Sequence, residues 1–227
     1  KEMPESFILY KPKDIVSGDF YWVEKKNDKI YFAAVDCTGH GVPGAFMSIV
    51  GYNALNEALR NNDDPASILD DLNKGVGKTL HNNAMGGSTT KDGMDLALCC
   101  YDKKTGELQY AGAFNPLYLV RDGEVNQVKA DKFAIGSYYE NSNNKYTNHK
   151  IQLQKNDYVY VFSDGYADQF GGPKGKKFMY KRFRDYLLTL NGKSMQAQKE
   201  FLNDTIEDWK GPLEQIDDIL VIGMHIA

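Results

Sequence analysis

Residues 30–48 read IYFAAVDCTGHGVPGAFMS and pass from a strand pattern to a helix pattern through a glycine-rich turn. The apolar, β-branched and aromatic run from Ile30 to Val35 predicts a buried strand. The run ends at Asp36, and a Gly-His-Gly turn follows before a helical pattern begins near Ala45. An ionised carboxylate at the mouth of a buried strand is costly unless a cation lies against it. Asp36 is therefore a candidate ligand for a cation.

The composition of the chain excludes several classes of protein. At 227 residues the chain is long enough to bury a substantial core. Its 27 Lys and Arg residues against 31 Asp and Glu residues give a net charge of −4, which argues against a nucleic-acid partner held by bulk positive charge. No apolar run approaches the roughly 20 residues that span a bilayer, so no membrane contact by this segment is expected.

The cysteines and the chain start lead to two further expectations. Cys37, Cys99 and Cys100 have no metal-ligand spacing, and this usage is typical of a reduced, cytoplasmic protein. The chain begins at Lys1 without an initiator methionine. We expect it to be the C-terminal output domain of a longer protein, which an upstream segment could anchor to a membrane.

A second strand pattern precedes the first. Residues Val16 to Val23 predict an aromatic strand with Asp19 near its start, and Asn27-Asp28 predicts a hairpin turn into the next strand. Asp19 and Asp36 are about equally far from that turn, so an antiparallel hairpin places them at the same end. The two carboxylates are expected to share one ion.

The rest of the chain predicts two pairs of helices and many strands. The helix patterns cover residues 45–60, 65–80, 180–190 and 194–209. The other strand patterns cover residues 7–10, 94–101, 107–113, 117–121, 124–128, 148–153, 158–162 and 219–226. The four strands from 94 to 128 predict an antiparallel meander. We expect residues 1–227 to form a single α+β domain, with helices covering both outer faces of two stacked sheets.

Four acids share one local pattern, since each lies at a strand end near glycine or another acid: Asp19, Asp36, Asp164 and Asp217. Clustered carboxylates without cysteine or histidine suit a hard divalent cation, Mg²⁺ or Mn²⁺. Two such ions about 3.5–4 Å apart can polarise a phosphoryl group and generate a hydroxide between them. For any one of these acids a turn residue is the simpler interpretation. The four together favour a metal site.

Four motifs carry a resemblance to a known family: SGDFYW at residues 17–22, AVDCTGHGVPGA at 34–45, FSDGYADQFGG at 162–172 and DDILVIG at 217–223. In this order, and over nearly the whole chain, they resemble the stage-II-sporulation-E-like (SpoIIE-type) bacterial branch of the metal-dependent protein phosphatase 2C (PPM) superfamily. The resemblance implies a serine/threonine phosphoprotein phosphatase. It also implies a four-layer αββα sandwich of two mainly antiparallel sheets, with two divalent cations, Mn²⁺ or Mg²⁺, in the cleft between them.

The resemblance further implies a role for each acid. Asp36 would bridge both ions. Asp19 and the backbone carbonyl of Cys37 would complete the protein ligands of one ion, and Asp164 and Asp217 those of the other. Asp218 is the fallback for Asp217 if the register at this acid pair is off by one.

The implied reaction is an in-line attack of a metal-generated hydroxide on phosphorus, without a phosphoenzyme. The leaving serine alkoxide needs a proton, and His40 is the titratable candidate in the turn, with a metal-bound water as the alternative acid. The arginine that anchors phosphate in eukaryotic members has no counterpart before Asp19. Lys11 and Lys13 are the nearby candidates, so the phosphate anchor stays open.

Family precedent implies a particular substrate and a regulator. The substrate would be phosphoserine or phosphothreonine on a STAS-type anti-sigma-factor antagonist, in a bacterial partner-switching signal-transduction pathway. The regulator would be an upstream sensor or dimerisation segment outside this chain. Helix 45–60 and the polar loop 82–91 are hypothetical switching elements. A catalytically weak phosphatase-like domain that only binds a protein partner is the alternative function, and the full set of four acids argues against it.

Three other features allow competing interpretations. Gly39, Gly41 and Gly44 spell G-x-G-x-x-G, but no second parallel strand follows, so a dinucleotide site is rejected. The basic run from Lys174 to Arg184 either docks an acidic or phosphorylated partner or is a solvated face, which is the simpler interpretation. Asp95 and Asp168 are interpreted as structural, and Asp95 is the one to test for an accessory metal.

Overall fold

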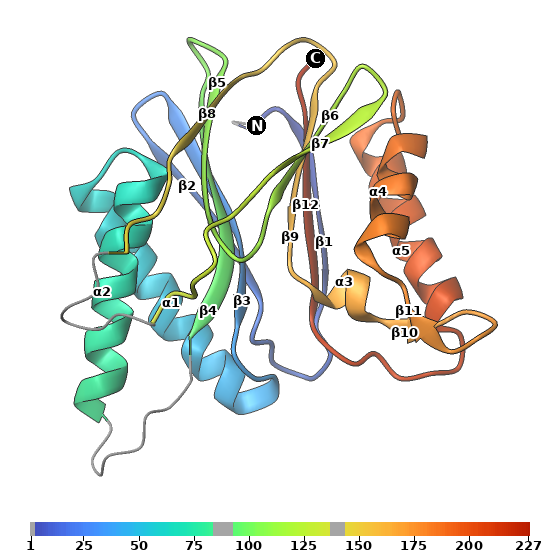
Figure 1. Cartoon of the computed structure of the whole chain (residues 1–227), viewed down its shortest axis with the longest axis horizontal. Coiled ribbons are helices and arrows are strands. Elements are labelled where there is room, and N and C mark those ends of the chain that lie inside the picture. Colours follow the sequence, from blue (N-terminus) through green and yellow to red (C-terminus); the bar gives the residue numbers. More distant parts are fainter. Residues whose placement is uncertain (1–2, 84–92, 137–143) are drawn as a thin grey trace.

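Two five-stranded sheets are stacked face to face in the computed structural model, which describes residues 3–83, 93–136 and 144–227 (Figure 1). A pair of helices covers the outer face of each sheet, and every pairing between neighbouring strands of the two sheets is antiparallel. The expected α+β class, a four-layer αββα sandwich, is confirmed.

The first sheet has the order β1-β12-β9-β6-β7. Its strands are β1 (Glu5–Lys11), β12 (Ile219–His225), β9 (Tyr158–Phe162), β6 (Leu117–Arg121) and β7 (Glu124–Val128). The second sheet has the order β2-β3-β4-β5-β8. Its strands are β2 (Phe20–Lys26), β3 (Lys29–Cys37), β4 (Met94–Asp102), β5 (Glu107–Ala113) and β8 (His149–Gln152).

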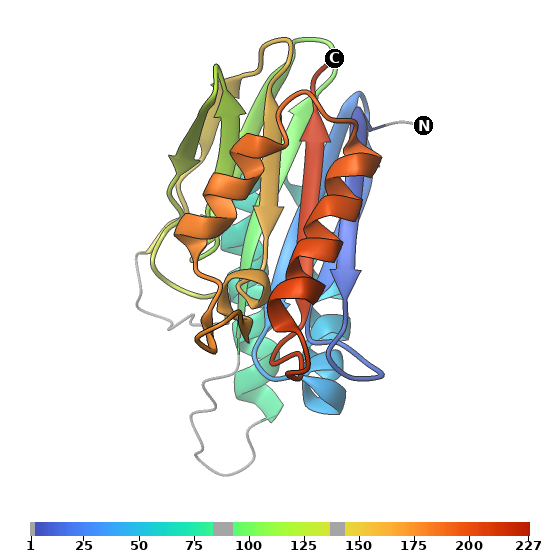
Figure 2. The ribbon, with the colours of Figure 1, turned by 90° about the vertical axis from the view of Figure 1, so that its right-hand side faces the viewer.

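The helices are divided between the two outer faces. Helices α1 (Gly41–Asn61) and α2 (Pro65–Asn83) cover the second sheet, while α4 (Tyr180–Thr189) and α5 (Met195–Lys210) lie side by side on the first (Figures 1 and 2). A short helix, α3 (Gly165–Asp168), follows β9, and a small hairpin of β10 (Phe170–Gly171) and β11 (Lys176–Lys177) leads on to α4. Among the described residues no helix is long and apolar enough to cross a bilayer, and all three cysteine thiols are free.

Strand β3 is buried on both faces, which explains its unbroken apolar run. Phe32 and Ala34 belong to the core between the two sheets. Tyr31, Ala33 and Val35, which alternate with them, belong to the core beneath α1 and α2. A third core fills the space between the first sheet and α4 with α5. The period-2 alternation of a strand therefore divides one apolar run between two layers.

The predicted strand Val16–Val23 is wrong in its first half. Strand β2 begins only at Phe20, and the residues before it form bends. Their backbone hydrogen bonds go elsewhere, because Gly18 N–H donates to the carboxylate of Asp218 rather than to a neighbouring strand. Helix α1 begins at Gly41, four residues before its predicted start. Pro43 is compatible with this start, because the N–H groups of the first helical turn have no partner within the helix and a proline there loses no hydrogen bond.

The predicted meander over residues 94–128 is also wrong, although its four strands are found where they were expected. Strands β4 and β5 belong to the second sheet, whereas β6 and β7 belong to the first. The chain changes sheet at Phe114, which has a positive φ of 57°, and Pro116 follows two residues later. Residues 84–91 of the predicted loop 82–91 lie outside the described residues, and positions 82 and 83 end α2.

Candidate metal centre

Five acids gather at one end of the sandwich because five strand ends meet there (Figure 1). They lie before β2, near the end of β3, near the start of β4, after β9 and before β12: Asp19, Asp36, Asp95, Asp164 and Asp217. In the hairpin register Phe20 pairs with Val35, so Asp19 and Asp36 lie at the same end, as predicted. Asp95 is directly opposite Asp36 in the β3–β4 pairing.

The carboxyl groups interact strongly with one another. Burial and then the charge of Asp36 raise the pKa of Asp19 to about 10. Burial, followed by the charges of Asp164 and Asp217, raises the pKa of Asp36 well above its usual range. Burial and neighbouring acids also raise the pKa of Asp164 to about 6 and that of Asp95 to about 6. Such a cluster is unfavourable in its ionised form unless cations neutralise it.

Asp19 shows most clearly that the cluster fits a cation. Its side chain is buried, with the whole residue 3% exposed. Its Oδ2 atom is fully buried and has no hydrogen-bond partner among the described residues. A buried carboxylate oxygen without a donor carries its full desolvation cost. A divalent cation would satisfy this oxygen, and oxygen ligands of this kind suit Mg²⁺ or Mn²⁺.

The backbone carbonyl of Cys37 faces the same region. A Cβ atom added at Gly18 would lie 3.2 Å from Cys37 O and would overlap Gly39 O. A Cβ atom at Gly44 would also overlap Gly39 O. These glycines therefore allow three backbone segments to approach closely beside Asp19, and the G-x-G-x-x-G spelling reflects this packing.

The two adjacent acids before β12 have different partners. Asp218 is 2% exposed, and its carboxylate accepts hydrogen bonds from Lys13 N–H at 2.7 Å and Gly18 N–H at 2.8 Å. The carboxylate of Asp217 accepts a hydrogen bond from Asp218 N–H at 2.9 Å. Asp218 is thus occupied in holding the segment before β2, and Asp217 is the better candidate ligand.

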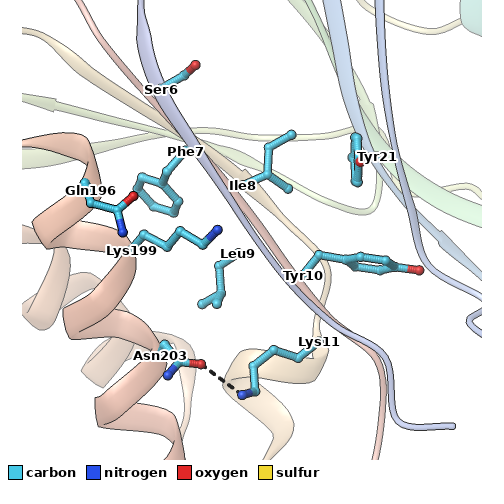
Figure 3. A pocket seen from close by; sticks show the side chains of 10 residues that line it. All are labelled: Ser6, Phe7, Ile8, Leu9, Tyr10, Lys11, Tyr21, Gln196, Lys199 and Asn203. Atoms are coloured by element: carbon cyan, nitrogen blue, oxygen red, sulfur yellow. Dashed lines mark hydrogen bonds between the residues drawn. The ribbon is translucent and has the colours of Figure 1, made fainter. Parts of the chain in front are cut away.

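His40 and the two candidate phosphate-binding lysines lie near this end but contact other groups. His40 Nδ1 is 2.9 Å from Asp14 Oδ2, and its Nε2 is 3.2 Å from Lys13 Nζ. Lys11 points to α5, where Nζ donates to Asn203 Oδ1 at 2.9 Å (Figure 3) and lies 2.7 Å from Glu207 Oε1. The ammonium group of Lys11 is therefore already paired away from the acids.

Two contacts of the site were not anticipated. Ser163 is buried beside Asp164, and a hydrogen bond from its side chain partly offsets the rise in the pKa of Asp19 that burial and Asp36 cause. Ser48 Oγ donates to Gly18 O at 2.7 Å and so holds α1 against the start of β2. The sequence points to these two serines only through their positions: Ser163 precedes Asp164, and Ser48 follows the glycine motif. Asp168 forms an ion pair with Lys177 at 2.7 Å, in agreement with its structural interpretation.

The acids do not form a complete protein-only ion site. Across the described ranges, no three His, Cys, Asp or Glu side chains are close enough together to hold one metal ion by themselves. The fit to a cation rests instead on the unpaired Asp19 oxygen, the mutual repulsion of the acids and the Cys37 carbonyl. Hard divalent cations commonly keep part of their coordination shell as water.

The sequence model of the family described as Stage II sporulation protein E (SpoIIE) matches residues 26–227. The chain belongs to the SpoIIE family. The SiaA-PP2C domain of Pseudomonas aeruginosa shares 33% identity, and its structure matches with a TM-score of 0.87 over 98% of this chain and 86% of that one. Together these findings identify the chain as a PP2C-fold domain of the SpoIIE family.

Two Bacillus subtilis proteins are more distant relatives of this SpoIIE-family domain. The phosphoserine phosphatase RsbU of strain 168 is 24% identical over 161 residues, which are 69% of this chain and 44% of RsbU. The match therefore spans less than half the length of RsbU. The structure of the PP2C phosphatase domain and a regulatory fragment of SpoIIE has a TM-score of 0.76 and 19% identity, over 96% of this chain and 60% of that one. At this identity the likeness supports the fold.

Proposed function

We propose that this SpoIIE-family domain hydrolyses phosphoserine or phosphothreonine on a protein, with two divalent cations, Mn²⁺ or Mg²⁺, at the acid cluster. The observation that carries the proposal is the buried, unpaired Oδ2 of Asp19 beside acids that raise one another's pKa. The proposed ligands are those implied by the family resemblance: Asp19, Asp36, the Cys37 carbonyl, Asp164 and Asp217. Bound there, the cations would polarise the phosphoryl group and lower the pKa of the attacking water.

The protein's own contribution is to hold these oxygens in place. Asp36 lies between the others, because it accepts a hydrogen bond from the Asp164 backbone and feels the charges of Asp164 and Asp217. This central position supports its proposed role as the bridging ligand. Asp218 and Ser48 fix the backbone of Gly18, the residue before Asp19. Ligands on rigid strand ends reduce the reorganisation that catalysis requires.

Two roles beside the acids stay predictions. His40 is the proposed general acid for the leaving alkoxide, and its imidazole is half-exposed between Asp14 and Lys13. Lys13 is the remaining candidate for phosphate contact, since the ammonium group of Lys11 is paired with α5. A positively charged group beside the phosphoryl oxygens would stabilise the transition state.

The proposed biological role follows the relatives. RsbU is named a phosphoserine phosphatase, which supports a phosphoprotein substrate here. We propose a STAS-type anti-sigma-factor antagonist as that substrate, within a partner-switching pathway in the cytoplasm. We also propose that the chain is the output domain of a longer protein, controlled by an upstream sensor or dimerisation segment.

The test is release of phosphate from p-nitrophenyl phosphate and from a phosphoserine protein, with and without Mn²⁺. We expect hydrolysis that needs the cation and that falls by at least about a hundredfold in Asp36→Asn and Asp164→Asn, because each removes a proposed metal ligand. Asp122→Asn is the matched control, since this acid lies in a turn with a φ of 52°, which asparagine also adopts. No cation-dependent hydrolysis by the wild type would instead favour a domain that only binds its partner.

A further inference from the structure

A pocket of about 560 Å³ lies between β11, the start of α4 and the end of α5. Half of its ten lining residues are cationic, and only one, Asp185, is acidic. The cationic residues are Lys174, Lys176, Lys177, Lys181 and Arg182. We call this site the basic pocket. Its charge contrasts with the net charge of −4 of the whole chain.

The floor of the basic pocket is aromatic and fixed. The guanidinium carbon of Arg182 lies 4.0 Å from the ring centroid of Trp209 and 5.4 Å from that of Phe178. Trp209 Nε1 donates to Gln169 O at 3.0 Å, and Trp209 O accepts from Gly172 N–H at 2.7 Å. An arginine stacked in this way keeps its donor groups oriented for a carboxylate or phosphate.

Most of the lysines in the basic pocket have no acidic partner. Lys177 pairs with Asp168 at 2.7 Å. Within the described part of the chain, no ion pair is formed by Lys174, Lys176 or Lys181, and all three are exposed. Like charges held together in one concave site repel one another and attract an anionic ligand. A concave site with five cationic side chains therefore favours ligand binding over a merely solvated surface.

The wall of the basic pocket is hydrogen-bonded to the segment that follows Asp164 in the chain. Phe178 N–H donates to Gln169 O at 2.9 Å, and Met179 N–H donates to Ala167 O of α3 at 2.7 Å. Helix α3 begins at Gly165, the residue after Asp164. A chain that occupies the basic pocket can therefore extend toward the acids.

We propose that the basic pocket docks an acidic segment of the phosphoprotein substrate, which rests on the proposed phosphatase function. The cationic rim selects carboxylates, and the exposed side chain of Met179, 57% accessible, offers an apolar contact at the edge. Mixed charged and apolar lining suits a protein segment better than a nucleic acid, whose recognition depends on a continuous basic surface. The basic pocket would then raise the affinity for the protein substrate without taking part in the chemistry.

The test compares Lys174→Glu/Lys181→Glu with a control of equal charge change, Lys103→Glu/Lys155→Glu. The control lysines are exposed in the β4–β5 and β8–β9 turns, at the opposite end of the strands from the acids. Each protein is assayed on p-nitrophenyl phosphate and on two phosphoserine peptides, which carry either a run of glutamates or the same run as glutamines. Binding of the unphosphorylated peptides is measured by fluorescence anisotropy at low and high salt.

We expect the wild type to prefer the glutamate peptide by about tenfold in kcat/KM at low salt, and less at high salt. The Lys174→Glu/Lys181→Glu protein should lose this preference while its hydrolysis of p-nitrophenyl phosphate is unchanged, and the control should keep both. Equal wild-type rates on the two peptides would overturn the proposal. So would equal losses in variant and control, or tighter binding of an oligonucleotide of the same charge. If no protein hydrolyses p-nitrophenyl phosphate, the proposed function fails, and anisotropy still decides whether the basic pocket binds the glutamate peptide.

Discussion

Asp217 and Asp218 are neighbours in the chain, yet their carboxylates have separate tasks. Asp218 points into the protein and accepts the N–H groups of Lys13 and Gly18, while Asp217 is only partly buried. An acid that satisfies two backbone donors stabilises the fold, and an acid with a single short-range partner remains available to a cation. The pair therefore separates structural support from the proposed metal binding.

Replacing these two acids should have opposite effects. Asp218→Ala leaves buried N–H groups without acceptors and should lower the free energy of unfolding by about 2–4 kcal/mol. Asp218→Asn keeps one acceptor and should cost less. Asp217→Asn should leave stability nearly unchanged and abolish cation-dependent hydrolysis. Urea unfolding and phosphate release measure the two properties, and the reverse pattern would show that Asp218 is the ligand.

His40 can be tested by the choice of leaving group. A serine alkoxide needs a proton as it leaves, whereas p-nitrophenolate is a much better leaving group and needs none. His40→Gln should therefore lower kcat on a phosphoserine peptide by about ten- to a hundredfold and leave p-nitrophenyl phosphate hydrolysis nearly unchanged. Equal losses on both substrates would assign the imidazole to holding Asp14 and Lys13 instead.

At this scale the sequence predicts which acids meet but not how each is used. Asp19 and Asp36 could be placed together because hairpin geometry is local, and their register confirms it. The tasks of Asp217 and Asp218 depend on a segment 200 residues away in the chain, to which no sequence pattern points. The same holds for Lys11, whose partner Glu207 lies on a distant helix.

The turn between β3 and α1 is an element whose glycines are needed for backbone contact. Gly18 and Gly44 both lie against the carbonyl oxygen of Gly39, so that the segment before β2 meets the first turn of α1. Ser48 Oγ of α1 donates a hydrogen bond across this contact, to Gly18 O at 2.7 Å. The backbone before Asp19 and the turn after Asp36 are thus in direct contact.

Adding one methyl group should disturb this contact. Gly18→Ala and Gly44→Ala each place Cβ on Gly39 O and should lower the free energy of unfolding by about 1–3 kcal/mol, with loss of hydrolysis. Gly75→Ala in α2 is the matched control, because no atom lies within 4 Å of its added Cβ. This control should raise stability by about 0.4–1 kcal/mol through better helix propensity. Thermal melts compare the three, and equal effects would contradict the close contact.

The elements themselves were largely predictable, because amphipathic periods and turn residues are local signals. The pairing of the strands was less predictable than the strands themselves. The predicted meander over residues 94–128 is wrong because β5 and β6 belong to different sheets. The sequence of the turn Phe114–Pro116 does not indicate whether the next strand joins the same sheet or the opposite one. The strand expected at Val16–Val23 is interrupted by a tertiary hydrogen bond to Asp218, which overrides local β-propensity.

For the whole molecule, the acid cluster opposes folding until a cation binds. Asp95 and Asp164 have pKa values of about 6 against an ordinary 3.8, and the pKa of Asp19 is about 10. Between the ordinary and raised values the folded protein binds more protons than the unfolded chain. The contribution of the cluster to stability is therefore most favourable at low pH and falls as pH rises from the ordinary value toward the raised values.

The metal-free protein should consequently melt at a lower temperature at about pH 8 than at about pH 5. Saturating Mn²⁺ should reverse this trend, because cations bind the ionised carboxylates and compete with protons. Asp164→Asn should weaken the pH dependence and the stabilisation by Mn²⁺ together. A melting temperature of the metal-free protein that rises from acid to neutral pH would contradict the cluster as described.

The central claim is that the acids around Asp36 bind the divalent cations used in phosphoprotein hydrolysis. Titration calorimetry with Mn²⁺ tests it most directly, since binding is measured apart from catalysis. We predict two ions per chain for the wild type and for Asp122→Asn, and a loss of about ten- to a hundredfold or more in affinity for Asp36→Asn. A wild-type isotherm without binding, or an Asp36→Asn isotherm equal to that of the wild type, would contradict the claim.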